Sequence, residues 1–405
     1  MKRASISPLP RPGWSRTLCA LFLAGMSAAA ASTAVAAPPS VPPPQRDGAG
    51  QSNDVPAAAA NHDDTPALEA EEKDLGWGIT GYPIIMYSPE MKFAAGGGFV
   101  LYYARRGLRP SSTEVEFIGS QTKALEINLK PTIYFQGNDY LLSAVAEVKR
   151  TPGTRFYGVG PNTTPAQEET YLHKSLGLNL AILRQVVKNV YLGPSLGLAG
   201  FRADEVEEGG MLAREAFTGG RAEQAFGAGV SLRVNTTDND FYPTQGFHSR
   251  LDALSYRHEF GSHHDFSQAT LDHRHYFSPF EGHVVALQFL ATLSSAEVPW
   301  QKMPRLGGGA MLRGYYEGRF RDQNYAAAQA EYRFPLVWRF GGAAFAAVGD
   351  VAGSVRGLVA ETVKAAGGGG LRFLLDSDEH INLRLDAAAT DRGDFDFYIN
   401  LLESF

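Results

Sequence analysis

Apolar and polar residues alternate with a period of two along most of the chain from residue 76 to residue 405. The segment 226–235 has one face with Phe226, Ala228, Val230, Leu232 and Val234 and another with Ser231, Arg233 and Asn235. Strands of about ten residues with one apolar and one charged face are typical of transmembrane barrels. A soluble β-sandwich is the alternative, but it would use shorter strands and place fewer ionisable groups along whole faces. No stretch after residue 36 has the roughly 18 apolar residues of a spanning helix.

The alternation gives sixteen candidate strands. Their spans are 79–88, 93–105, 112–121, 124–135, 139–149, 169–184, 189–203, 222–236, 246–257, 264–277, 282–295, 323–334, 342–350, 366–375, 380–389 and 396–405. Closure is needed because hydrocarbon offers no partner to an open sheet edge, and an even number places both ends on the same side. The connections at 150–168, 204–221, 296–322 and 351–365 are long, and those at 136–139 and 377–379 are short. We therefore predict an all-β fold, a sixteen-stranded antiparallel transmembrane barrel of the outer membrane.

The first 36 residues have the composition of an export signal. Four basic residues precede the apolar run 18–31, and Ala34-Val35-Ala36 fits a cleavage site. A membrane anchor is the alternative, but the apolar run is short and rich in Ala and Ser. Removing this segment takes away Cys19, the one cysteine, and changes the formal charge from −6 to −10 because four basic and no acidic residues are lost.

The next segment, 37–75, is rich in Pro, Ala and Asp and has no apolar period, which predicts a disordered tail. The predicted organisation is a signal peptide at 1–36, this tail at 37–75 and a barrel at 76–405. The net charge gives no indication of nucleic-acid binding.

The last predicted strand is amphipathic and ends on an aromatic residue. Phe397, Ile399, Leu401 and Phe405 share one face. A terminal Phe on such a strand resembles the sorting signal of outer-membrane barrels, which implies assembly by the barrel assembly machinery.

Three segments go beyond a generic barrel: 305–336 (RLGGGAMLRGYYEGRFRDQNYAAAQAEYRFPL), 238–254 (DNDFYPTQGFHSRLDAL) and 156–164 (FYGVGPNTT). Together they resemble the barrel of the BamA/TamA outer-membrane assembly superfamily, also called the bacterial surface antigen family. The opening 83–90 (PIIMYSPE) resembles members that lack POTRA domains. The resemblance covers about residues 76–405.

The resemblance implies a loop-lock motif, Leu312-Arg313-Gly314-Tyr315, in the connection 296–322. Gly307, Gly308 and Gly309 permit backbone turns that would fold this loop back into the barrel. A shielded Arg313 would need a carboxylate. The alternation along 323–334 points Glu331 inward, and Asp350 lies near the outer end of the next strand, so both are predicted partners. The family pattern there is D-x-G, whereas this chain has Asp350-Val-Ala-Gly353. A loop that only plugs and braces the barrel would use the same contacts.

The second segment resembles the family's periplasmic turn motif, here Asp240, Phe241, Pro243, Thr244 and Gly246. The function implied by the resemblance is insertion or translocation of protein, or of lipid, at the outer membrane, through a weak junction between the first and last strands. The implied partners are outer-membrane lipid, a periplasmic POTRA-like protein or a client polypeptide. A passive channel or structural surface barrel is the alternative. No catalytic constellation, metal site or cofactor is predicted, so we expect no enzyme.

Overall fold

The computed structural model describes residues 76–104, 108–239, 242–295, 298–359, 362–376 and 381–405. The predicted signal peptide and tail, 1–36 and 37–75, lie outside the described residues. The barrel strands are β1 (Gly76–Ser88), β2 (Lys92–Ala104), β3 (Ser111–Ser120), β4 (Leu125–Phe135), β5 (Tyr140–Phe156), β6 (Glu169–Val187), β7 (Val190–Asp204), β8 (Ala222–Asn235), β9 (Gly246–Tyr256), β10 (Phe266–Phe277), β11 (Val284–Ser294), β14 (Asn324–Val337), β15 (Phe340–Ala352), β16 (Lys364–Asp376), β17 (Ile381–Thr390) and β18 (Phe395–Leu401). Between β11 and β14, β12 (Arg305–Leu306) and β13 (Phe320–Arg321) form a separate two-stranded sheet.

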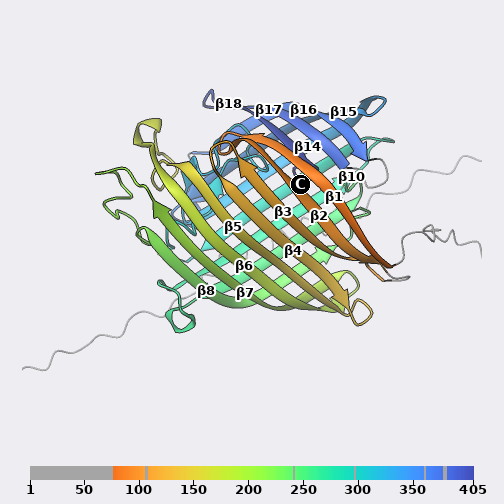
Figure 1. The fold of residues 1–405 in the computed structure, drawn as a ribbon, viewed down its shortest axis with the longest axis horizontal. Helices are drawn as coiled ribbons and strands as arrows, with labels where there is room; N and C mark the ends of the chain where they lie inside the picture. The colour runs from red at the N-terminus through yellow and green to blue at the C-terminus, as the bar shows by residue number, and fades with distance from the viewer. Residues whose placement is uncertain (1–75, 105–107, 240–241, 296–297, 360–361, 377–380) are drawn as a thin grey trace, which may run out of the picture. The chain divides into compact units, whose positions relative to one another are not determined.

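The sixteen strands form one closed barrel in which every neighbouring pair is antiparallel (Figure 1). Each strand pairs with the next in the chain, and β1 closes the ring against β18. Closure gives the backbone groups of the edge strands a partner inside hydrocarbon, where water is absent. The prediction of a sixteen-stranded antiparallel barrel is confirmed. Short 3-10 turns lie in three connections, at Pro165–Gln167, His258–Phe260 and Val355–Val359.

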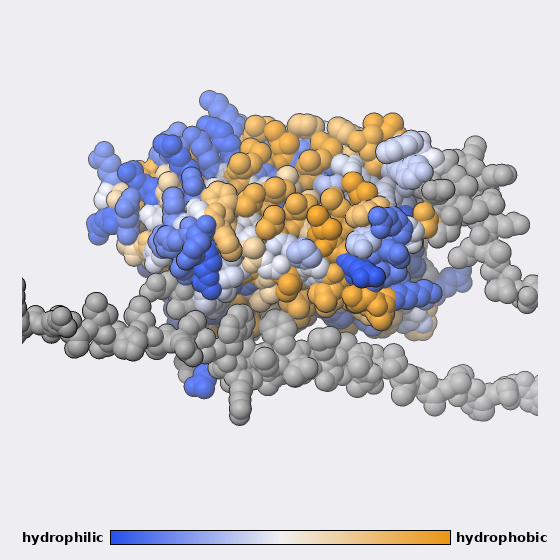
Figure 2. Space-filling model, turned by 90° about the horizontal axis from the view of Figure 1, so that it is seen from below, coloured by the Kyte–Doolittle hydropathy of each residue, from blue (hydrophilic) through white to orange (hydrophobic). Residues whose placement is uncertain are grey.

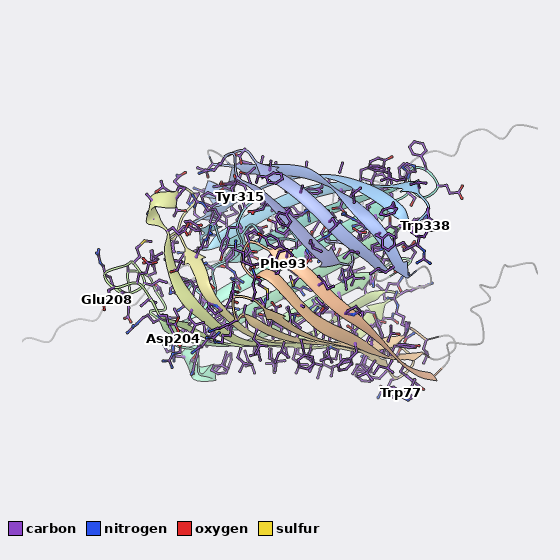
Figure 3. The ribbon with its side chains drawn as sticks, turned by 45° about the horizontal axis from the view of Figure 1, so that its top comes forward. Trp77, Phe93, Asp204, Glu208, Tyr315 and Trp338 are labelled. Carbon is purple, nitrogen blue, oxygen red and sulfur yellow. The ribbon has the colours of Figure 1, made fainter. Side chains whose placement is uncertain are left out.

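The two ends of the barrel differ in their connections. Asp204 and Glu208 lie at the end with the long connections, and Trp77 and Trp338 lie at the end with the short ones (Figure 3). We call these the loop end and the turn end. No helix within the described ranges is long and apolar enough to cross a membrane.

Side chains on the two faces of the strands differ as the alternation predicts. Val230 is 55% exposed whereas its neighbour Ser231 is buried, and Tyr332 faces outward beside the buried Glu331. On the face shown in Figure 2, an apolar band lies between two more polar ends. This band matches the hydrocarbon layer of a bilayer.

Two strand ends depart from the sequence prediction by more than three residues. β5 continues past 149 to Phe156, because the chain passes Pro152-Gly153 in a bulge between Thr151 and Thr154 and then resumes pairing with β6. β18 ends at Leu401 and not at residue 405. Leu402 adopts a positive φ of 63°, and its N–H donates to the carbonyl of Asn382 at 2.8 Å, which turns the chain into the lumen.

Candidate functional site

The long connection between β11 and β14 folds back into the barrel. Leu306, Met311, Leu312, Tyr315 and Phe320 pack on inward-facing residues of β14, β15 and β16. Figure 3 labels Tyr315 near the loop end. This apolar contact, together with the polar contacts below, places the predicted loop-lock motif against the lumen wall.

Glycine is required where the connection turns. Gly307 has a φ of 103°, and a Cβ there would lie 2.3 Å from the carbonyl oxygen of Tyr316. Gly308, also at positive φ, donates its N–H to the carbonyl of Tyr315 at 2.9 Å. Gly314 has a φ of 104° and packs on β17. Other residues would be strained at these positions.

Arg313 is fully buried between two strands. Its Nη2 donates to Oε2 of Glu331 on β14 at 2.7 Å, and its Nη1 donates to Oδ2 of Asp386 on β17 at 2.5 Å. Its guanidinium carbon lies 3.4 Å from the ring centroid of Phe345 on β15. The planar fork of arginine can hold two carboxylates while its face stacks on an aromatic ring. Arg313 therefore connects three strands of the barrel wall.

The prediction of Asp350 as a second partner of Arg313 is wrong. Asp350 accepts from Nζ of Lys364 at 2.5 Å and from Oγ1 of Thr362 at 2.6 Å. Arg313 lies at the level of Phe345, and Asp350 is five residues further along the same strand, about 16 Å at strand rise. This distance is too long for the arginine to contact both.

Asp386 takes the place predicted for Asp350. It reaches Arg313 across the glycine-rich part of β16, where a Cβ on Gly370 would lie 2.1 Å from Oδ1 of Asp386. The run Gly367–Gly370 was a sequence signal of this close approach, because glycine in a strand interior often marks a site where another group comes near.

Three more arginines complete a charge network around the two acids. Arg372 donates to Oδ1 of Asp386 at 2.6 Å, and Arg333 donates to Oε1 of Glu331 at 2.9 Å. Nε of Arg384 lies 3.4 Å from Oδ2 of Asp386. Buried charges are tolerated only when they are paired, so each acid shared by several arginines stabilises the arrangement as a unit.

The last four residues of the chain enter this network. Glu403 accepts from Nε of Arg372 at 2.8 Å and from Nδ2 of Asn382 at 3.1 Å. Nη2 of Arg333 donates to the carbonyl oxygen of Phe405 at 2.8 Å. Residues 402–405 therefore fill part of the lumen at the turn end.

The prediction that Phe405 shares a face with Phe397, Ile399 and Leu401 is wrong. Phe397 is 43% exposed on the outside, whereas Phe405 is buried with Tyr276 and Ala286. The positive φ at Leu402 ends the strand, so side chains after Leu401 no longer alternate between the two faces of the sheet. A role of Phe397, Ile399, Leu401 and Phe405 as a sorting signal stays a prediction.

Replacing Phe405 with alanine separates packing from sorting. We expect the refolded variant to lose about 3 kcal/mol, the lower end for truncation of a buried phenylalanine. Thermal unfolding of the refolded protein in detergent measures this loss, and the yield of barrel in outer membranes measures sorting. An unchanged unfolding temperature together with a reduced yield would mean that Phe405 serves only in assembly.

The segment 156–164 docks on the folded-in connection. The N–H of Gly160 donates to the carbonyl of Arg321 at 2.8 Å, and Nη2 of Arg319 donates to the carbonyl of Thr163 at 3.0 Å. The hydroxyl of Tyr315 donates to Asp391 in the β17–β18 connection. Two of the three segments that resembled the family therefore form one assembly near the loop end.

The predicted turn motif lies at the opposite end, between β8 and β9. Asp240 and Phe241 lie outside the described residues. Pro243 is buried, and Gly246 has a φ of 92° with no room for a Cβ beside the carbonyl of Thr236.

The carboxylate that closes this turn was missed by the sequence interpretation. Asp238 accepts from the N–H of Thr244 at 2.9 Å and from its hydroxyl, and from the N–H of Gln245 at 3.1 Å. These hydrogen bonds hold the pKa of Asp238 below its usual value. Asp240 was the aspartate predicted for this motif, but Asp238, three residues before Phe241, makes the turn.

The junction between β1 and β18, which we call the seam, is narrow. A single pair of Cα partners, Tyr87↔Ile399, joins β1 to β18. The pairs that join β1 to β2 run from Gly76↔Ala104 to Ser88↔Lys92. The ring of Tyr87 also stacks on Phe397, with centroids 4.1 Å apart and planes 4° from parallel. One residue therefore supplies both the backbone register and an aromatic contact across the seam.

The folded-in connection contacts both sides of the seam. The N–H of Gly314 donates to the hydroxyl of Tyr398 on β18 at 3.0 Å. The N–H of Glu317 donates to Glu90, in the turn between β1 and β2, at 2.7 Å.

The Glu317 side chain pairs with Arg305 at 2.8 Å, and this guanidinium holds the pKa of the Glu317 carboxyl below its usual value.

Replacing Tyr87 with alanine should loosen the seam. The stacked pair contributes about 0.5–1.5 kcal/mol. We expect backbone amides of β1 and β18 to exchange with deuterium faster in Tyr87→Ala. The control is Phe135→Ala, which removes the Phe135–Tyr140 stack away from the seam. Equal exchange at the seam in the two variants would contradict a special role for Tyr87.

Comparison with known proteins identifies the family. Residues 111–375 match the Omp85 superfamily domain. No curated protein sequence matches the chain. BamA from Haemophilus ducreyi lacking POTRA domains 1–3 has a similar structure, with 13% identity, a TM-score of 0.54, and coverage of 80% of this chain and 69% of that chain.

Two further solved structures are similar. CdiB from Acinetobacter baumannii has 13% identity, a TM-score of 0.50, and coverage of 80% of this chain and 59% of its own. CdiB from Escherichia coli has 12% identity, a TM-score of 0.51, and coverage of 80% and 62%. This chain therefore spans less than two thirds of either CdiB chain. At these identities the likeness concerns the fold alone.

The resemblance stated from the sequence is confirmed by the family match, which covers more than half of the chain. The barrel and its apolar band agree with the bacterial outer membrane as its location. At the level of the family, the match to the Omp85 superfamily domain supports insertion or translocation of protein at that membrane. The chain is a member of the Omp85 superfamily, a β-barrel of the bacterial outer membrane.

Proposed function

We propose that this protein inserts or translocates a client polypeptide at the outer membrane by opening its seam. The observation that carries the proposal is the single register pair Tyr87↔Ile399. Strand β1 has 13 residues and β18 has seven, so the edge of β1 extends beyond its partner. An unpaired strand edge is a template on which another strand can add.

The charge network supports this role by bracing one side of the opening. Arg313 ties β14 to β17 through Glu331 and Asp386. Gly314 extends the connection to Tyr398 on β18. We propose that the loop-lock motif keeps the wall from β14 to β18 rigid, so that opening is confined to the seam.

The alternative is a passive channel. It is favoured by a cavity of about 780 Å³ in the lumen beside β1 to β10. A passive channel would conduct steadily in a planar bilayer and would need no client. A protein that opens at the seam should show small, flickering conductance and should contact a client at β1.

The test uses a photo-reactive amino acid on the edge of β1 in growing cells. Ile79 is 67% exposed near the turn end of β1 and is the test position. Leu129, 41% exposed on β4, is the control. We expect outer-membrane or secreted polypeptides to be captured at Ile79 and not at Leu129, and the same polypeptides to be depleted when the gene is deleted. A periplasmic POTRA-like partner would be captured from the turn end in the same experiment. An unchanged outer membrane and secretome after deletion would exclude the proposal.

A further inference from the structure

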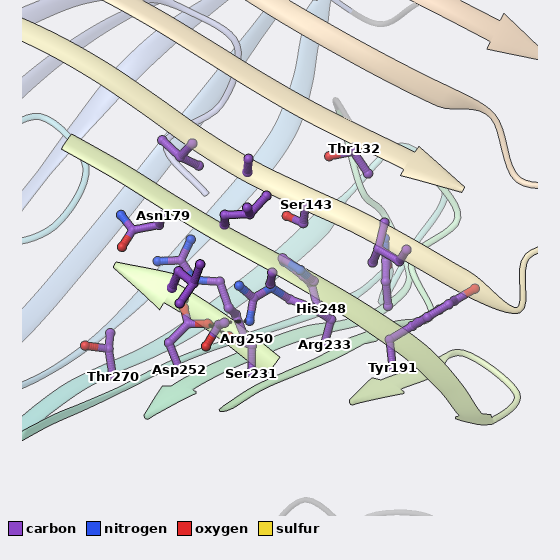
Figure 4. A pocket seen from close by; sticks show the side chains of 18 of the residues that line it. Thr132, Ser143, Asn179, Tyr191, Ser231, Arg233, His248, Arg250, Asp252 and Thr270 are labelled. Atoms are coloured by element: carbon purple, nitrogen blue, oxygen red, sulfur yellow. Dashed lines mark hydrogen bonds and ion pairs between the residues drawn. The ribbon is translucent and has the colours of Figure 1, made fainter. Parts of the chain in front are cut away.

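The lumen has a cavity, lined by both polar and apolar side chains, that the folded-in connection does not fill. Its volume is about 780 Å³, and its lining comes from strands β1 to β10 together with Lys302 and Pro110. The part of the connection from Leu306 to Phe320 packs on β14, β15 and β16, and Lys302 of the same connection lies at the cavity wall. Figure 4 shows polar side chains from several strands directed into this space, among them Asn179, Arg250 and Thr270. The volume is within the range of about 300–1,000 Å³ typical of small-molecule sites.

Positive charge exceeds negative charge in the lining. Arg233, Arg250 and Lys302 line the cavity, and Asp252 is the one carboxylate among the lining residues, all of which are described. A single carboxylate can neutralise one of the three cations. The cavity wall therefore has two formal positive charges in excess.

Asp252 already has several donors. Its Oδ1 accepts from the hydroxyl of Ser231 and lies 2.8 Å from Nη1 of Arg233. Its Oδ2 lies 3.3 Å from Nε of Arg250. This arrangement leaves Asp252 little capacity for a further cation.

Arg250 and Lys302 are the cations with fewest partners. The Arg250 side chain is 41% exposed. Within the described residues, its ionic contact is the one with Asp252. Nζ of Lys302 lies 5.1 Å from the ring centroid of Tyr256. The forked donors of an arginine and the point charge of a lysine together suit a small oxyanion.

We propose that this cavity is a binding chamber for a small oxyanion, a phosphate or a carboxylate. The hydroxyls of Thr132, Ser143 and Thr270 line the same space and offer neutral donors to the oxyanion. The chamber does not depend on opening of the seam, and it goes beyond the proposed function.

A second group of charges lies on β3 and β4, outside the lining. Lys130 lies 2.9 Å from Glu116 and 3.2 Å from Glu114. Because two carboxylates surround this lysine, no anion should gather there. Lys130 is therefore a matched control, an inward-facing cation whose charge is already neutralised.

The experiment is isothermal titration calorimetry on the full-length barrel in detergent, at constant ionic strength set with sodium chloride. Inorganic phosphate and succinate are titrated separately. The variants are Arg250→Gln, Lys302→Gln and Lys130→Gln, and heat-modifiable mobility verifies that each is folded. We expect at least one of the anions to bind the wild type, with affinity about tenfold lower in Arg250→Gln and in Lys302→Gln, because a charged hydrogen bond is lost. Lys130→Gln should bind as the wild type does.

Binding of phosphate alone assigns the chamber to phosphates, and binding of succinate alone assigns it to carboxylates. Absence of heat with both anions would overturn the proposal. An equal loss of affinity in Lys130→Gln would also overturn it, because the anion would then respond to the charge of the whole lumen.

Discussion

Arg313→Ala is expected to destabilise the barrel by up to about 3–5 kcal/mol, the cost of breaking a buried ion pair, because Glu331 and Asp386 each lose one donor. Glu331 keeps Arg333 and Arg372, and Asp386 keeps Arg372 and Arg384. The Arg313, Glu331 and Asp386 side chains are all fully buried, so solvent does not weaken this effect. The connection between β11 and β14 should become accessible to protease, while export is unaffected. Arg313→Lys should restore only part of the stability, because lysine cannot present two donors in one plane.

Double-mutant cycles, measured by thermal unfolding in detergent micelles, identify the partners. We expect a coupling energy of about 0.5–3 kcal/mol between Arg313 and Glu331, and likewise between Arg313 and Asp386. The control is the Arg313–Asp350 cycle, which should be additive within about 0.5 kcal/mol. Additivity in the Arg313–Asp386 cycle would mean that this contact does not hold the connection.

The sequence predicted the barrel well because its strongest pattern is local. The alternation across a strand follows from backbone geometry, and a membrane barrel maintains it along every strand. Prediction failed where the backbone leaves the regular strand. At Leu402 a positive φ ends the alternation, and at Pro152-Gly153 a bulge lets β5 continue where the sequence indicated a loop.

The candidate site was only partly predictable. The role of Glu331 as a partner of Arg313 could be predicted, because the alternation on its strand directs its side chain into the lumen. Asp386 did not, because its contact with Arg313 depends on how four strands are positioned in the closed barrel. Glu403 entered the network only after the chain had turned inward at Leu402. Such contacts between distant segments leave little trace in one sequence, apart from the glycine run on β16.

The second large effect is expected when the seam is covalently closed. Tyr87 and Ile399 are direct Cα partners, and removal of the predicted signal peptide would leave the chain without its own cysteine. A disulfide between Tyr87→Cys and Ile399→Cys would prevent β1 from separating from β18. The matched control joins Phe117→Cys and Ile127→Cys, Cα partners on β3 and β4. If the seam must open, only the first disulfide should abolish function.

The deciding measurement is the amount of client polypeptide that reaches the outer membrane or the medium in cells carrying each cysteine pair, under oxidising and reducing conditions. The account predicts that the Tyr87–Ile399 disulfide stops client delivery, that reduction restores it, and that the Phe117–Ile127 disulfide has no effect. Undiminished delivery through a barrel shown by electrophoresis to be fully crosslinked at the seam would contradict it.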